Sequence, residues 1–245
     1  MSNITVLNSG AITTSGSGAY GVYSNTNSGT NTFTNSGTIT TSGGAAYGIF
    51  STANSGTSTM TSSGTITTSG LYSHVLYSRN NSGTSTLTNS GTITTSGSSG
   101  SQGIQSNGNS GTANITNSGT ITTSGQYSYG VYSNANSGTL TISNTSNDTI
   151  STSGSSSHGI FLNANTGTAT ITNSGTIQVT GSSAVGVTLD GGVTLNNSGT
   201  ISATGSATQA IDSTGSGNDT LNLSSGSNIT GTIDLGDGTD TVNIT

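Results

Sequence analysis

The stretch N-S-G-T-I-T-T-S-G at residues 35–43 decides the fold of this chain, because it returns almost unchanged along the sequence. Copies occupy residues 89–97 and 117–125, and residues 62–70 differ only at the first position. Successive central isoleucines are separated by 27, 27, 27, 28, 29, 27 and 24 residues. These isoleucines are Ile12, Ile39, Ile66, Ile93, Ile121, Ile150, Ile177 and Ile201. A fixed period of this length is typical of solenoid architectures.

Two further apolar columns keep step with the isoleucines. The second column is Val22, Ile49, Leu76, Ile104, Val131, Ile160, Val187 and Ile211. The third is Phe33, Met60, Leu87, Ile115, Ile142, Ile171 and Leu195. Each apolar residue lies in a short β-prone run between Ser-Gly turns, and the dense Gly, Ser, Thr and Asn content disfavours helix. Three strands per repeat predict an all-β parallel β-helix (β-solenoid) with about nine coils of about 27 residues.

The chain is expected to form one solenoid in two parts. Residues 1–211 carry the regular repeats, and residues 212–245 form terminal acidic coils of the same solenoid. Two columns of asparagine mark the turns between strands, one beginning at Asn8 and Asn35 and the other at Asn27 and Asn54. Asparagine tolerates left-handed backbone and can hydrogen-bond to its copy in the next coil. We therefore interpret both columns as architectural.

Composition excludes several classes of function. Only 3% of the residues are charged, and the net charge of −6 includes a single cationic side chain, Arg79, which disfavours nucleic acid as a partner. No cysteine is present, so disulfides and thiolate zinc sites are excluded. The chain has no apolar run long enough for a membrane helix, and we expect no membrane insertion by this segment. Any export signal or anchor is expected to lie outside these residues.

The repeated phrase, together with Y-G-V-Y at residues 20–23 and 129–132 and Y-G-I-F at residues 47–50, resembles autotransporter passenger domains. The ending G-S-N-I-T-G-T-I-D-L-G-D-G-T-D-T-V-N-I adds to this resemblance, which covers nearly the whole chain. It implies a right-handed β-helix that is extracellular or displayed on the outer-membrane surface. It also implies adhesion, aggregation or self-association as the function.

An enzymatic role is not expected. A general acid–base pair needs two titratable groups within reach of one bond, but Asp148 and Asp190 are isolated and Arg79 has no acidic residue near its own coil. The two histidines, His74 and His158, occupy a slot that holds tyrosine in other coils. We interpret them as substitutions in a stacked column.

The C-terminal aspartates leave two readings open. Gly217–Leu221 and Gly238–Val242, with Gly215 and Gly236, each partly match the G-x-G-x-D-x-U core of calcium-binding β-roll repeats. Asp219 and Asp240 are then candidate calcium ligands, and calcium is the one candidate cofactor. In the other reading the terminal coil simply stacks Asp219 on Asp240 without an ion.

Threonine gives the most regular surface pattern. Residues that flank an inward isoleucine point outward in a strand, which predicts a surface threonine ladder. Its members are Thr38, Thr40, Thr65, Thr67, Thr92, Thr94, Thr120 and Thr122. A second array is expected from Thr32/Thr34, Thr59/Thr61, Thr86/Thr88 and Thr170/Thr172. Such T-x-T ranks resemble those of ice-binding (antifreeze) proteins, although threonine is also a favoured polar strand residue.

An aromatic ladder is predicted beside the second apolar column. Its members are Tyr23, Phe50, Tyr77, Tyr132 and Phe161, each directly after an inward residue and therefore facing outward. Stacked surface aromatics suit contacts with sugars or with another rod. The leading expectation is a non-enzymatic surface protein that acts by adhesion or self-association, including filament formation. Its expected partners are copies of itself, end to end or side by side, or a host or neighbouring cell surface, and ice binding is the alternative.

Overall fold

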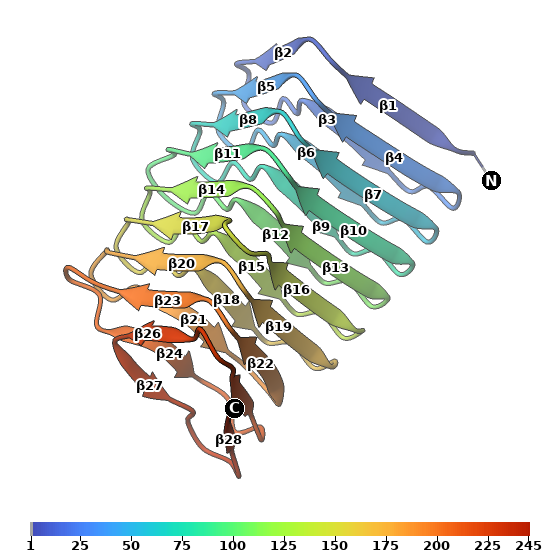
Figure 1. The fold of residues 1–245 in the computed structure, drawn as a ribbon. Helices are drawn as coiled ribbons and strands as arrows, with labels where there is room; N and C mark the ends of the chain where they lie inside the picture. Colours follow the sequence, from blue (N-terminus) through green and yellow to red (C-terminus); the bar gives the residue numbers. More distant parts are fainter. Residues whose placement is uncertain (1) are drawn as a thin grey trace.

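The chain folds into a rod of stacked coils, seen in a computed structural model that describes residues 2–245. The described residues contain 28 β-strands and no helix. Each coil contributes one strand to each of three parallel sheets, here called A, B and C, with ten, nine and nine strands. The predicted all-β solenoid with about nine coils is therefore confirmed (Figure 1).

The strands follow the chain in the repeating order A, B, C. Sheet A contains β1 (Ile4–Asn8), β4 (Thr30–Asn35), β7 (Thr57–Ser62), β10 (Thr84–Asn89), β13 (Thr112–Asn117), β16 (Leu140–Asn144), β19 (Ala169–Asn173), β22 (Val193–Asn197), β25 (Thr220–Leu223) and β28 (Thr241–Ile244). Sheet B contains β2 (Ala11–Thr14), β5 (Thr38–Thr41), β8 (Thr65–Thr68), β11 (Thr92–Thr95), β14 (Thr120–Thr123), β17 (Thr149–Thr152), β20 (Thr176–Val179), β23 (Thr200–Ala203) and β26 (Asn228–Thr230). Sheet C contains β3 (Val22–Asn25), β6 (Ile49–Thr52), β9 (Leu76–Arg79), β12 (Ile104–Asn107), β15 (Val131–Asn134), β18 (Ile160–Asn163), β21 (Val185–Leu189), β24 (Gln209–Ser213) and β27 (Thr232–Asp234).

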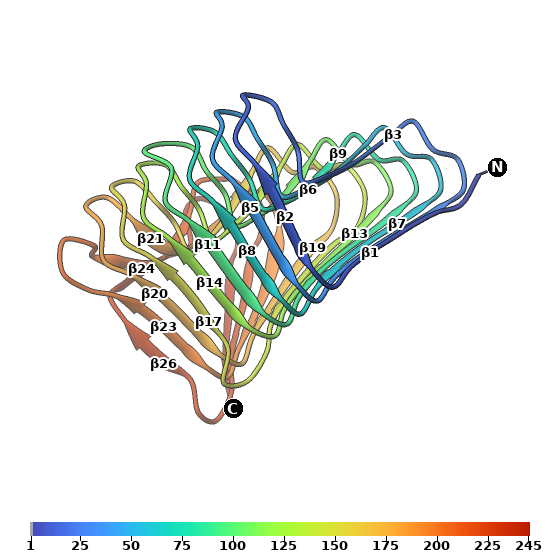
Figure 2. The same ribbon diagram turned by 90° about the horizontal axis from the view of Figure 1, so that it is seen from above.

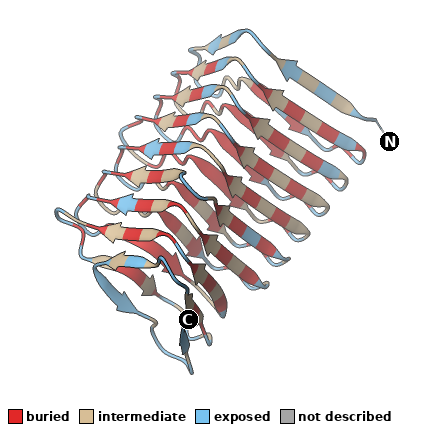
Figure 3. Ribbon diagram, viewed as in Figure 1, coloured by how far each residue is buried: buried red, intermediate tan, exposed pale blue. Residues whose placement is uncertain are grey.

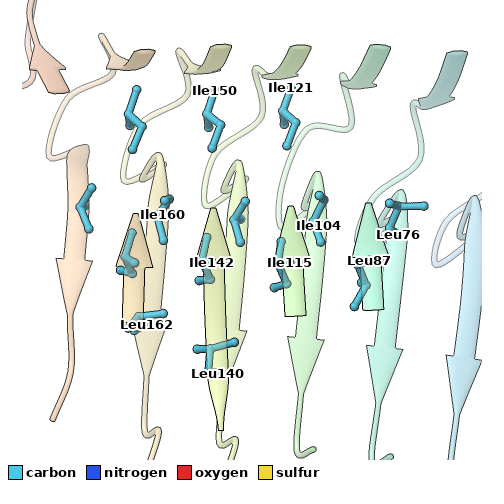
Figure 4. Close-up of a cluster of buried hydrophobic side chains, with 14 of the residues drawn as sticks. Leu76, Leu87, Ile104, Ile115, Ile121, Leu140, Ile142, Ile150, Ile160 and Leu162 are labelled. Carbon is cyan, nitrogen blue, oxygen red and sulfur yellow. The ribbon is translucent and has the colours of Figure 1, made fainter. Parts of the chain in front are cut away.

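The three apolar columns line the interior in register. In sheet B, Ile66 pairs with Ile93 and Ile93 with Ile121, and all three side chains are fully buried. Figure 4 shows the same stacking for buried leucines and isoleucines of neighbouring coils. One coil cannot enclose its own apolar side chains, so each coil depends on its neighbours for burial.

Glycine is required at the corner that leads into sheet B. A Cβ atom on Gly91 would lie 2.0 Å from the carbonyl oxygen of Gly64 in the preceding coil. Consecutive coils approach closely here because strands of one sheet lie only about 4.8 Å apart. The N-S-G turn therefore repeats with the strands, and the coils superpose along the rod (Figure 2).

The asparagine columns form hydrogen-bonded ladders, as the sequence predicted. In one column Asn117 Nδ2 donates to Asn144 Oδ1 at 2.8 Å, and Asn144 Nδ2 donates to Asn173 Oδ1 at 2.8 Å. In the other, the backbone N–H of Asn54 donates to Oδ1 of Asn81 in the next coil at 2.7 Å. These side chains are buried, so the ladders satisfy backbone and side-chain groups that water cannot reach.

A column of inward threonines was not predicted. In β5, Thr41 lies inside the solenoid and its Oγ1 donates to the carbonyl oxygen of Ala46 at 2.8 Å. Thr68 makes the same bond to Ser73 in the next coil. The second threonine of T-I-T-T thus ties the end of sheet B to the loop that follows it.

Burial decreases in the last coil. The proposed boundary between residues 211 and 212 falls within β24, and pairing continues to β27, with a register shift between Gln209 and Ile211, and to β28. The side chains of β27 and β28 are all exposed, including Ile233, Val242 and Ile244 (Figure 3).

Candidate functional surface

The predicted threonine ladder lies on the outer side of sheet B. Thr38 pairs with Thr65, Thr65 with Thr92 and Thr92 with Thr120, and these four side chains are exposed. Thr40, Thr67 and Thr94 form a second, half-buried row, and Thr122 is exposed. The parallel register therefore sets methyl and hydroxyl groups in two ranks at the strand spacing of about 4.8 Å.

Sheet A carries a wider array than the sequence suggested. The outer positions of β4 are Thr30, Thr32 and Thr34, because the inward residues of this strand are the buried Asn31, Phe33 and Asn35. The register repeats the three threonines in β7 and β10. The additional column is Thr30, Thr57, Thr84 and Thr112. This column was not predicted from the sequence, because the strands of sheet A begin three residues before the apolar anchor.

No strand of sheet A or sheet B contains a charged residue, over the part of the chain that the structure describes. Residues 2–189 carry only Arg79, in sheet C, and Asp148, in a turn before β17. The other six aspartates lie between residues 190 and 240. Two sides of the rod are thus polar but uncharged, and the negative charge is concentrated in the terminal coils.

The aromatic ladder lies outside the solenoid but is mostly covered. Rings of Phe50 and Tyr77 stack with centroids 4.8 Å apart, and those of Tyr132 and Phe161 stack at 5.4 Å. Tyr23 is 48% exposed, whereas Phe50 and Tyr77 are each only 5% exposed. The expectation of an open aromatic contact surface is therefore wrong for these two residues.

A second ring column provides the cover. Tyr20 stacks on Tyr47 at 5.1 Å, and Tyr47 stacks on His74 at 4.9 Å. Tyr47 also meets Phe50 edge to face at 5.1 Å. The two columns form a double ladder whose rings shield one another, so its main contribution is to stability rather than to open contact area.

The histidines sit in this second column as neutral side chains. His74 Nδ1 accepts the N–H of Gln102 at 3.1 Å, and His158 Nδ1 accepts the N–H of Val185 at 2.9 Å. Burial lowers the pKa of His74 to about 3 and that of His158 to about 4. An imidazolium cannot accept these bonds, so the geometry also favours the neutral form. The interpretation of both residues as members of a stacked column is confirmed.

The tyrosines of the double ladder are held in the neutral form as well. Burial raises the pKa of Tyr47 and that of Tyr129 to about 12. Partial removal from water disfavours the phenolate. The double ladder is therefore uncharged near neutral pH.

The C-terminal aspartates form two separate pairs. Asp212 and Asp234 pair on the outer side of sheet C, and burial together with the charge of Asp234 raises the pKa of Asp212. Asp219 and Asp240 are joined by a bond of 2.8 Å from the Asp219 N–H to Asp240 Oδ1. Asp219 itself is buried, which is the main reason that its pKa is raised. Residues 2–245 bring no three His, Cys, Asp or Glu side chains together as a metal cluster.

Comparison of the chain with family models, with curated proteins and with solved structures finds no match. Among the described residues there is no helix with the length and apolar character needed to cross a membrane.

Proposed function

We propose that this solenoid is a non-enzymatic extracellular surface protein that associates side by side with copies of itself. The observation that carries the proposal is the complete lack of charged residues in the strands of sheets A and B. Charged side chains keep most proteins apart in solution, and a surface with no net charge favours association. The resemblance to autotransporter passenger domains supports the same class of function.

Sheet A is the face that we assign to the contact. Its outer side presents three threonine columns in register, and flat sheets with identical ranks can interdigitate face to face. Ten strands about 4.8 Å apart, on average about 17 Å long, give a face of roughly 750 Å². A stable interface buries about 800 Å² on each partner. The face is therefore large enough for a specific contact.

The test places positive charge on sheet A. We expect the wild-type protein to show a mass that rises with concentration in sedimentation velocity, and the double variant Thr59→Lys/Thr86→Lys to remain monomeric because facing lysines repel. The control Asn134→Lys/Asn163→Lys places the same charge on the outer side of sheet C. It should associate as the wild type does. A monomeric wild type, or association by the sheet A variant equal to that of the wild type, would refute the proposal.

Ice binding is a second candidate, supported by the in-register T-x-T ranks of sheet B. Thr67 lies in the middle of these ranks, and tyrosine is compatible with a strand. Thr67→Tyr would therefore spoil the spacing without unfolding the rod. We expect no thermal hysteresis in the parent protein, because the ranks change to Thr149/Ser151 and Thr176/Gln178 beyond β14. Hysteresis in the parent that Thr67→Tyr abolishes, with unchanged melting, would replace self-association by ice binding.

A further inference from the structure

The interior corner between sheets C and A changes its chemistry along the rod. In early coils it holds paired hydroxyls, with Ser78 and Ser85 Oγ atoms 2.7 Å apart. Three coils further along the same positions hold the apolar Leu162 and Ala169. In β24 and just before β25 the corner becomes polar again, with Ser213 and Asp219, in the coil after the apolar pair Leu189 and Val193.

Asp219 takes over the hydrogen bond that an asparagine makes in other coils. In the buried column, Asn81 Oδ1 accepts the N–H of Asn54, and Asn81 Nδ2 donates to Ser78 Oγ at 2.7 Å. Asp219 Oδ1 likewise accepts the N–H of Val193 at 2.7 Å. Its second oxygen, however, is an acceptor where asparagine offers a donor. The amide satisfies both of its ends within the protein, and the carboxylate satisfies one.

Two buried oxygen atoms lack a well-formed hydrogen bond as a result. Asp219 is 1% exposed and Ser213 is 8% exposed, and neither Oδ2 of Asp219 nor Oγ of Ser213 makes a hydrogen bond of normal geometry. Burial raises the pKa of Asp219, and the Ser213 side chain nevertheless lies close enough to the carboxylate to lower that pKa in part, which places the two oxygen atoms at one site. A buried carboxylate oxygen without a partner is costly, because the ion has lost its hydration and gained nothing in return. Asp240, bonded to the backbone N–H of Asp219, adds a second carboxylate beside it. A proton or a cation is needed to offset the negative charge of the two carboxylates at this corner.

We propose that Asp219 Oδ2, Ser213 Oγ and the carboxylate of Asp240 bind a calcium ion at the junction between the coils before residue 190 and the acidic terminal coil. The donors are all oxygen, the atom type that Ca²⁺ prefers, and no soft ligand lies near them. Carbonyl oxygens and water complete such sites in other proteins. Two carboxylates place the affinity in the range of about 0.1–1 mM that is typical of extracellular calcium modules.

The experiment titrates calcium into the whole chain and follows heat by calorimetry and unfolding by circular dichroism. We expect saturable binding and a raised Tm in the wild type, and neither effect in Asp219→Asn. This variant should fold without calcium, because the amide supplies the donor that the Asn column uses. Asp148→Asn removes one charge in a distant turn and should bind calcium as the wild type does. Ser213→Ala should weaken binding severalfold.

Three outcomes would overturn the assignment. The first is the absence of saturable binding in the wild type at calcium concentrations up to about ten times the expected dissociation constant. A proton or water would then be the partner of Asp219. Equal binding by wild type and Asp219→Asn would assign calcium to the exposed aspartates instead. If sodium chloride at the same ionic strength raised the Tm as much as calcium does, the calcium effect would be explained by screening of the aspartate charges. None of these outcomes bears on the association of sheet A, which is measured separately.

Discussion

The coils before residue 190 and the coils after it use one backbone plan with different side chains. Before residue 190 the apolar columns are buried beyond the first coil, the asparagine columns continue with one interruption at Ser62, and the charges of Arg79 and Asp148 are opposite. After it the spacing between paired residues varies between 21 and 28, the side chains of the last coil become exposed, and aspartates occupy ladder positions. An asparagine both accepts and donates, so a column of asparagines satisfies itself, whereas aspartates only accept and repel one another. The comparison indicates that the stability of a coil depends on neutral, self-complementary columns.

The largest expected difference between the two regions concerns inward apolar residues. Ile93→Asp would place an unpaired charge in a fully buried column and should cost several kcal/mol or prevent folding. Ile233→Asp, at a position that is 43% exposed in the last coil, should cost less than about 1 kcal/mol. Thr94→Asp, on the outer side of the strand that contains Ile93, is the control for inserting a charge into a strand.

Urea unfolding followed by circular dichroism measures all three variants. Equal midpoints for Ile93→Asp and Thr94→Asp would contradict the assigned inward and outward faces. Equal midpoints for Ile93→Asp and Ile233→Asp would show that the two regions do not differ in the way that their burial indicates.

An intermediate difference is expected for the asparagine columns. Asn136 is buried, accepts the N–H of Asn109 at 2.7 Å and donates to Ser133 Oγ at 2.6 Å. Asn136→Ala leaves these groups buried without partners and should cost about 2–3 kcal/mol. Asn243 is exposed and donates to Asn222, so Asn243→Ala should cost less than about 0.5 kcal/mol. Thermal unfolding of the two variants checks this ranking, and similar losses in both would remove the proposed role of the buried column.

Much of the solenoid could be predicted from the sequence, because columns with a constant spacing are visible in the letters alone. Ile39 and its copies predicted sheet B, and Asn8 and Asn35 predicted a ladder that the structure contains. The cover over Phe50 could not be predicted. Tyr47 lies outside the strand, across the bend at Gly48, so the alternation of inward and outward residues in a strand does not give its direction.

The inward position of Asp219 was hidden for a different reason. The spacing between paired residues is close to 27 over most of the chain but varies between 21 and 28 near its end, so the sequence did not align Asp219 with Val193. The third threonine column of sheet A was missed because Thr30 and Thr57 lie at strand ends that propensity alone does not define. In both cases the pairing register, rather than the local sequence, determines which way a side chain points.

The last expected difference concerns pH, and it belongs to the coils before residue 190, since His74 and His158 both lie there. Their pKa values are about 3 and about 4 in the folded protein, below the value of 6.5 for an unperturbed histidine. The unfolded chain therefore takes up these protons first. The stability that the neutral imidazoles provide is complete above about pH 6.5 and is lost as the pH falls toward 4.

We expect the wild-type Tm to decrease over this window, and His74→Tyr/His158→Tyr to show a flatter dependence of Tm on pH. The double variant should melt lower at pH 7, because the N–H groups of Gln102 and Val185 lose their acceptors. Asp219 and the other aspartates are present in both proteins, so the difference between the two curves isolates the histidines. Parallel curves between pH 7 and pH 4 would show that protonation of the histidines is not coupled to unfolding, and would leave the acidic terminal coil as the source of any pH dependence.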